Sequence, residues 1–137
     1  MSISKNLRKS MKDVMEVSNL KKAEYIQNLL ISKGFTWPSH EKAKEKVLEE
    51  IEELFVEISS SSIDRERLED EFGDCLFSLI NLACRLNLDS DKCLNLAISK
   101  FEKRIALIEK KAKEQGLTLE EVNLPQMLKW WKEVKEN

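Results

Sequence analysis

The sequence predicts an all-α protein, and three features of the chain lead to that prediction. Only three glycines and two prolines occur in 137 residues, whereas all-β and collagen-like chains need many turn residues or glycines. The chain is rich in Leu, Lys and Glu, which favour helices. Apolar side chains recur at helical spacing, and no strand-like alternation competes with them. We therefore expect a helical bundle of four main helices plus a short C-terminal helix.

The first half of the chain contains two predicted helices. Residues 1–18 are polar and unpatterned and form a leader, flexible or helical, ahead of a single domain over residues 19–137. The first helix is predicted at 19–33, where Gly34 ends it. Ser39 is the expected N-cap of the second helix, which runs to about Ile58.

The second half contains two further long helices and a short one. Asp64 is expected to cap a third helix that ends near Asn87, after a serine-rich loop at 59–62. A fourth helix starts at Asp89 or Ser90, runs to about Gln115 and stops at Gly116. Pro125 lies near the start of the last helix.

Composition and charge exclude several classes of protein. The net charge is −2, so general affinity for nucleic acid or for acidic membranes is not expected. Residues 1–12 lack the apolar region of a signal peptide, and the longest apolar stretch, 75–88, is too short and too polar to span a membrane. The three cysteines are nine residues apart without a C-x-x-C pair, which is typical of reduced thiols in a cytoplasmic protein.

The second and third predicted helices each carry a polar strip. On the second helix, Glu50, Glu53 and Glu57 flank an apolar arc, a pattern that taken alone is typical of a solvated surface. The third helix is apolar nearly all round from 68 to 86, so we expect it to be central and buried, with Gly73 at a close approach of a neighbouring helix. Its polar residues nevertheless form one narrow stripe: Glu71, Asp74, Ser78, Asn81 and Arg85. Such a stripe on a buried helix must face a polar pocket.

The carboxylates of these two helices are expected to converge. A short loop favours antiparallel packing, which brings Glu50 and Glu53 near Glu71 and Asp74. Four adjacent carboxylates repel one another unless a hard divalent cation binds them, and magnesium prefers such oxygen ligands. His40 is the only histidine, so a catalytic triad or a zinc site is excluded.

The same residues carry a resemblance to a known family. The segments 49–53 (EEIEE) and 71–74 (EFGD) resemble the E-E-x-x-E and E-x-x-D signature of MazG-type nucleoside triphosphate pyrophosphohydrolases, within the all-α superfamily. The resemblance runs from about Leu20 to the C-terminus and is to the catalytic C-terminal unit of two-domain MazG proteins. Further similar segments are 34–38 (GFTWP), 46–50 (KVLEE), 100–104 (KFEKR) and the pair Trp131 and Lys135. Ile98 departs from the family, where an Asn usually stands.

The resemblance implies Mg²⁺-dependent hydrolysis of a nucleoside triphosphate to the monophosphate and pyrophosphate, with Mn²⁺ as an alternative metal. It implies a metal site formed by Glu50, Glu53, Glu71 and Asp74. Glu49 would hold an outer metal or orient water. The expected substrate-binding residues are Lys46, Lys100, Arg104, Trp131 and Lys135, of which the first three would meet the phosphates and Trp131 would stack on the base or close the pocket. Trp37 and Trp130 are expected to be packing residues. A homodimer or a higher homo-oligomer is also implied.

Two alternatives remain open at this point. The first is another pyrophosphohydrolase of the superfamily, of the phosphoribosyl-ATP or dUTP/dCTP type. The second is a non-catalytic helical interaction module whose acidic flanks only keep it soluble. A panel of substrates would decide the first alternative. Magnesium-dependent thermal stabilisation and pyrophosphate release would distinguish an enzyme from the interaction module.

Overall fold

The computed structural model describes residues 18–136 and confirms the all-α prediction over that range. Those residues contain no strand, and the helices are α2 (Asn19–Ser32), α3 (His40–Ile58), α4 (Arg65–Arg85), α5 (Ser90–Glu114), the 3₁₀-helix η1 (Leu119–Glu121) and α6 (Leu124–Glu136). The four main helices and the shorter C-terminal helix are all present, and η1 is an addition to the prediction. Apart from Ser18, the predicted leader lies outside the described residues.

The helix ends follow the local signals in the sequence. Ser39 caps α3 by accepting a hydrogen bond from the Lys42 amide at 3.1 Å, and Asp64 caps α4 by accepting from the Glu66 amide at 3.0 Å. Gly34 after α2 has a φ of 86°, a left-handed conformation that glycine adopts without a steric penalty. These short-range interactions set the length of the helices that carry the acidic residues.

The chain divides into two compact units between Asp91 and Lys92. The first unit contains α2, α3 and α4, and the second contains most of α5 together with η1 and α6. No helix among the described residues is both long enough and apolar enough to cross a membrane. That residues 19–137 act as one catalytic domain stays a prediction.

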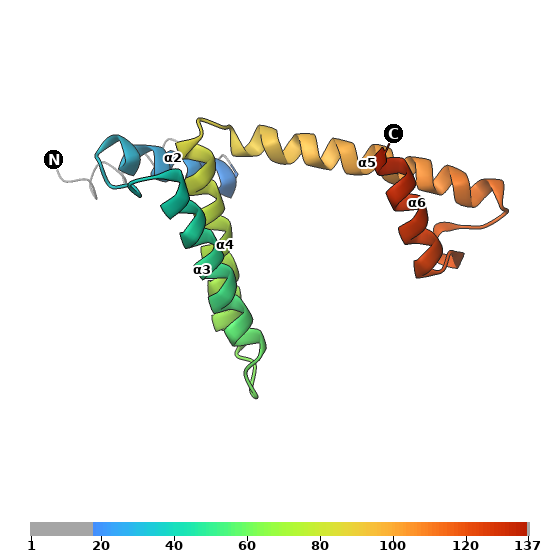
Figure 1. Cartoon of the computed structure of the whole chain (residues 1–137), viewed down its shortest axis with the longest axis horizontal. Coiled ribbons are helices and arrows are strands. Elements are labelled where there is room, and N and C mark those ends of the chain that lie inside the picture. The colour runs from blue at the N-terminus through green and yellow to red at the C-terminus, as the bar shows by residue number, and fades with distance from the viewer. Residues whose placement is uncertain (1–17, 137) are drawn as a thin grey trace. The chain divides into compact units, whose positions relative to one another are not determined.

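In the first unit, α3 and α4 lie side by side as an antiparallel hairpin, and α2 packs against α4 (Figure 1). The buried apolar side chains of this unit are small or medium in size: Ala43, Val47, Cys75, Ile80 and Cys84. The hairpin arises because the loop between Ile58 and Arg65 is short, and a short loop returns the next helix alongside the previous one. This geometry brings the acidic strips of the two helices together.

The expectation that α4 is buried all round is wrong for the described chain. Its side chains Phe72 and Leu76 remain 54% and 48% exposed. The reason is that α2 and α3 are the elements of this unit packed against α4, and two neighbours cannot cover a helix that is apolar on most of its surface. Among the described residues, no atom beyond the adjacent backbone of α4 itself lies within 4 Å of the position that a Cβ of Gly73 would take, so the expected close approach is absent there too.

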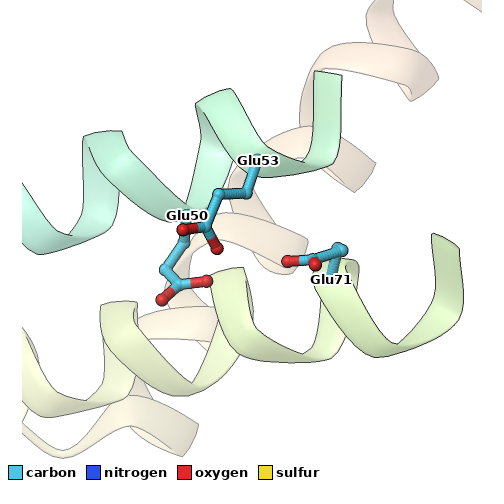
Figure 2. A group of neighbouring side chains, drawn as sticks. All are labelled: Glu50, Glu53 and Glu71. Atoms are coloured by element: carbon cyan, nitrogen blue, oxygen red, sulfur yellow. The ribbon is translucent and has the colours of Figure 1, made fainter. Parts of the chain in front are cut away.

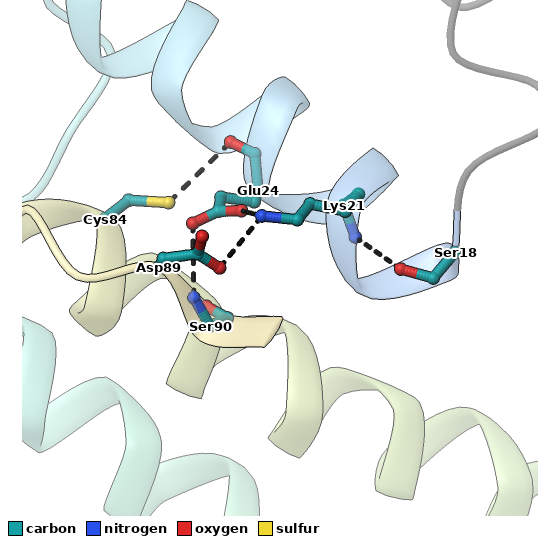
Figure 3. A network of polar contacts seen from close by, with 6 residues as sticks. All are labelled: Ser18, Lys21, Glu24, Cys84, Asp89 and Ser90. Atoms are coloured by element: carbon teal, nitrogen blue, oxygen red, sulfur yellow. Dashed lines mark hydrogen bonds and ion pairs between the residues drawn. The ribbon is translucent and has the colours of Figure 1, made fainter. Parts of the chain in front are cut away.

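A polar network ties the start of α5 to α2 (Figure 3). Lys21 Nζ lies 2.8 Å from Asp89 Oδ1 and 3.5 Å from Glu24 Oε2, and Glu24 Oε1 accepts a hydrogen bond from the Ser90 amide at 3.2 Å. Cys84 Sγ donates to the Glu24 carbonyl oxygen at 3.7 Å. Burial raises the pKa of the Cys84 thiol to about 11, so this thiol stays protonated and packs as a small apolar group.

The second unit has its own core, formed by the facing sides of α5 and α6. Ile108, Ala112, Trp130 and Val134 are buried together. Ile108 is fully buried, and burial of such a side chain contributes about 1.5–3 kcal/mol. Trp130 is therefore a packing residue, as the sequence predicts.

Candidate active site

Three of the four predicted metal-binding carboxylates come together on the α3–α4 hairpin. Glu50 and Glu53 lie one turn apart on α3, and Glu71 faces them from α4 (Figure 2). One carboxylate oxygen from each residue lies within 4.8 Å of the others. This acidic cluster, formed by Glu50, Glu53 and Glu71, brings three negative charges close to one another.

The acidic cluster contains two buried oxygen atoms that lack a hydrogen-bond partner among the described residues. They are Glu50 Oε2 and Glu71 Oε2. Glu50 as a whole is only 6% exposed, so water cannot compensate its charge freely. Buried carboxylate oxygens require a hydrogen-bond donor or a cation. Three carboxylates supply only oxygen ligands, which fit a hard divalent cation such as Mg²⁺.

Lys46 supplies the positive charge next to the acidic cluster. Its Nζ lies 2.7 Å from Glu50 Oε1 and 3.7 Å from Glu49 Oε1. The hydrogen bond to Glu50 raises the pKa of the Lys46 ammonium, which therefore stays charged. Glu49 itself is exposed. One positive charge compensates only part of the negative charge gathered here.

Two carboxyl groups at this site, those of Glu53 and Asp74, have raised pKa values. Glu53 is exposed, and the Glu50 charge is the main cause that raises the pKa of its carboxyl, with slight desolvation and the charges of Glu71 and Glu49 adding to it. The pKa of the Asp74 carboxyl is also raised, first by desolvation and then by the charges of Asp70 and Glu50. Both shifts favour the neutral carboxyl, and a cation bound beside these groups would favour the charged form instead.

Asp74 lies apart from the three grouped carboxylates. It lines a cavity together with Lys46 and Glu50. It is not among the three residues whose carboxylate oxygens lie within 4.8 Å of one another. Its role as a fourth ligand stays a prediction.

The cavity beside the acidic cluster has a volume of about 490 Å³ and belongs entirely to the first unit. Asp74, Ser78 and Asn81 of the predicted polar stripe of α4 line it, so part of the stripe faces a cavity, although most of the cavity surface is apolar. Trp37 also lines it and is 39% exposed, which corrects the expectation of a packing role. Trp37 belongs to the loop between α2 and α3, and its carbonyl oxygen accepts a hydrogen bond from Arg85 of α4.

Sequence reasoning missed Gln27, which is buried and lines the same cavity. The signal was present in the helical spacing. Gln27 follows Ala23 by four residues and precedes Leu30 by three, so it is an amide on the apolar face of its helix.

The remaining predicted substrate-binding residues belong to the second unit. The Arg104 guanidinium lies over the Trp131 ring, 5.7 Å from its centroid, and the Phe101 ring lies 5.2 Å from the same indole. Lys100 is exposed on α5, four residues before Arg104, and Lys135 is exposed near the end of α6. Contact between these side chains and phosphate stays a prediction.

Comparison with known proteins connects this geometry to a family. Residues 38–108, which include the whole α3–α4 hairpin, match the MazG nucleotide pyrophosphohydrolase domain. The chain is 35% identical over 116 residues to a nucleoside triphosphate pyrophosphohydrolase of Escherichia coli, covering 85% of this chain and 44% of that protein. It is 36% identical over 119 residues to the nucleoside triphosphate pyrophosphohydrolase/pyrophosphatase MazG of Thermotoga maritima, covering 87% and 45%. The chain thus spans less than half the length of these curated relatives.

Proposed function

The chain belongs to the MazG nucleotide pyrophosphohydrolase family, and from this premise we propose that it hydrolyses a nucleoside triphosphate to the nucleoside monophosphate and pyrophosphate with Mg²⁺ as cofactor. The observation that carries the proposal is the pair of buried oxygens, Glu50 Oε2 and Glu71 Oε2, that have no hydrogen-bond partner in the part of the chain that the structure describes. A divalent cation would compensate both at once. The names of the Escherichia coli and Thermotoga maritima relatives support the same reaction class.

Glu50, Glu53 and Glu71 would hold the cation, and Asp74 is the proposed fourth ligand. An all-oxygen donor set suits Mg²⁺, and Mn²⁺ is the proposed substitute because it accepts the same ligands. When bound, the cation supplies positive charge that neutralises the phosphates and favours deprotonation of the attacking water.

The chain's own residues then position the substrate and the water. Lys46, now paired with Glu50 at 2.7 Å, is proposed to turn to a phosphate oxygen once a cation compensates Glu50. Glu49 is exposed within 3.7 Å of Lys46, where its carboxylate would orient a water molecule. In-line placement of that water supplies much of the catalysis in phosphoryl transfer.

Three further cations are proposed to bind the substrate. Lys100 and Arg104 are four residues apart on α5 and therefore share a face of the helix. We propose that they and Lys135 bind phosphate oxygens, and that Trp131 stacks on the base or closes the pocket. The contact of Arg104 with the Trp131 ring at 5.7 Å supports a joint role.

The exposed apolar side chains of α4 support a homodimer or a higher homo-oligomer as the working form. Phe72 and Leu76 are about half exposed in the single chain, and a second copy would remove them from water. Light scattering of the purified protein would measure the mass of the assembly. A cytoplasmic location also stays a prediction.

Product analysis tests the proposed reaction directly. Purified protein is incubated with Mg²⁺ and each of the common ribo- and deoxyribonucleoside triphosphates, with phosphoribosyl-ATP included to test that alternative. We expect monophosphate and pyrophosphate in equal amounts, and label from ¹⁸O water in one of these two products. Steady release of orthophosphate would contradict the reaction class, and no release of either product would favour the interaction module.

A further inference from the structure

The cavity beside the acidic cluster contains polar groups that metal binding and phosphate chemistry do not use. Its volume of about 490 Å³ is within the usual range for small-molecule sites. Lys46, Glu50 and Asp74 line it, and so do the amide side chains of Gln27 and Asn81. The cavity therefore joins a charged region to an uncharged hydrogen-bonding region.

The two amides form a bridge between α2 and α4 that leaves one acceptor free. Gln27 Nε2 donates to the Phe77 carbonyl oxygen at 3.4 Å, and Asn81 Nδ2 donates to Gln27 Oε1 at 2.8 Å. A carbonyl oxygen can only accept, so the Gln27 amide must turn its NH₂ group to Phe77, and Gln27 Oε1 must then face the NH₂ group of Asn81. Asn81 Oδ1 is then left without a partner among the described residues, although Asn81 is only 7% exposed. A buried acceptor of this kind requires an N–H or O–H group from elsewhere.

The spacing along α4 separates the amide from the charged region by the length of a nucleoside. Asp74, Ser78 and Asn81 line the cavity at positions i, i+4 and i+7 of one helix face. Seven residues correspond to about 10 Å along the helix axis. A ligand with phosphate at the Asp74 end would place its base, one ribose away, near Asn81.

Aromatic side chains line the same cavity and offer flat surfaces for a base. They are Phe35, Trp37 and Phe77, which are 75%, 39% and 40% exposed as whole residues, and every nucleobase can stack on such rings. Arg85 holds the loop that carries Trp37 against α4, because it donates to Thr36 Oγ1 at 2.6 Å and to the Trp37 carbonyl oxygen. The stacking surface is therefore anchored to the same helix as Asn81.

We propose that this cavity binds the nucleoside part of the substrate and that Asn81 Oδ1 selects the base by accepting a hydrogen bond from one of its N–H groups. Gln27 is a positioning residue that holds the Asn81 amide in the accepting orientation. The proposal rests on the proposed function, since it takes the acidic cluster as the phosphate end of the ligand. Aromatic stacking supplies affinity for any base, and Asn81 supplies the discrimination.

The first experiment measures kcat/KM for ATP, GTP, CTP and UTP with the unaltered protein, Asn81→Leu and Gln27→Leu. The base ratio is kcat/KM for the best of the four substrates divided by kcat/KM for the poorest. We expect this ratio to fall about tenfold or more in both variants, the worth of one hydrogen bond. The loss should appear in KM for the best base, with kcat little changed, because the contact is the same before and during the reaction. Partial unfolding cannot mimic this result, because the folded fraction cancels in a ratio measured on one preparation.

Asn28→Leu is the matched control, because it removes an exposed amide at the neighbouring position of α2. Its base ratio should equal that of the unaltered protein. An unchanged base ratio in Asn81→Leu would overturn the proposal while leaving the proposed reaction intact.

A second experiment uses the unaltered protein and does not depend on turnover. Nucleoside monophosphates are titrated in chelator while tryptophan fluorescence is recorded, with Trp37→Phe used to assign the signal. A monophosphate methylated at the base N–H groups should bind about tenfold more weakly than its parent. Equal affinity for the two would overturn the proposal. Base-selective binding without any hydrolysis would instead overturn the proposed function alone.

Discussion

Replacing Glu71 by Gln removes one negative charge from the acidic cluster while keeping the size of the side chain. Carboxylate oxygens of Glu50 and Glu71 lie within 4.8 Å of each other. Two unit charges at that distance repel by about 1 kcal/mol in water and by about 3.5 kcal/mol at an effective dielectric constant of 20. Lys46 compensates part of the Glu50 charge. We therefore expect Glu71→Gln to raise the free energy of unfolding in chelator by about 1–2 kcal/mol, which corresponds to a melting temperature a few degrees higher.

Magnesium should reverse the order of stability. A cation at 100 times its dissociation constant stabilises the folded protein by about 2.7 kcal/mol, and the unaltered protein should gain close to this amount. Glu71→Gln lacks one ligand and should gain much less, and its Mg²⁺-dependent turnover should be lost. Thermal unfolding followed by circular dichroism, in chelator and in Mg²⁺, gives both comparisons.

Glu52→Gln is the control, because Glu52 is exposed on α3 and is not part of the acidic cluster. Its melting temperature should stay within the small range that surface substitutions usually show. If Glu71→Gln melted at a lower temperature than the unaltered protein in chelator and gained as much from Mg²⁺, the assignment of Glu71 as a ligand would be wrong.

Arg104→Ala should lower kcat/KM for a nucleoside triphosphate by about 10- to 100-fold, the worth of a charge-assisted hydrogen bond. Lys103→Ala, about 100° round the helix, should change it little, and equal effects would leave Arg104 as ordinary surface charge. Stability in chelator should rise as the pH falls through the raised pKa of the Glu53 carboxyl, and this gain should be complete below its ordinary value of 4.5, because the folded state takes up the proton first. Melting curves at several pH values check this, and Glu53→Gln should flatten the dependence. Ile108→Ala should cost about 2–5 kcal/mol in urea unfolding, since Ile108 is fully buried, and a loss under about 1 kcal/mol would contradict its place in the core.

The sequence by itself determines where the helices begin and end. Ser39 and Asp64 cap the helices that the sequence predicts, and Gly34 and Gly116 follow the ends of α2 and α5 with positive φ angles. These features can be predicted because a cap or a left-handed glycine acts over only three or four residues. Most of the acidic cluster can be predicted for a similar reason, since a short loop returns α4 alongside α3.

The tertiary structure alone decides what surrounds the carboxylates. Glu50, Glu53 and Glu71 form one group of oxygens while Asp74 lies on the cavity wall, although spacing alone makes Asp74 equivalent to the others. The predicted burial of α4 is wrong in the described chain because an apolar pattern cannot say how many neighbours a helix has. Gln27 and Asn81 are 54 residues apart and meet across α2 and α4. Their hydrogen bond depends on how the two helices cross and turn about their axes, which no short-range pattern in the sequence encodes.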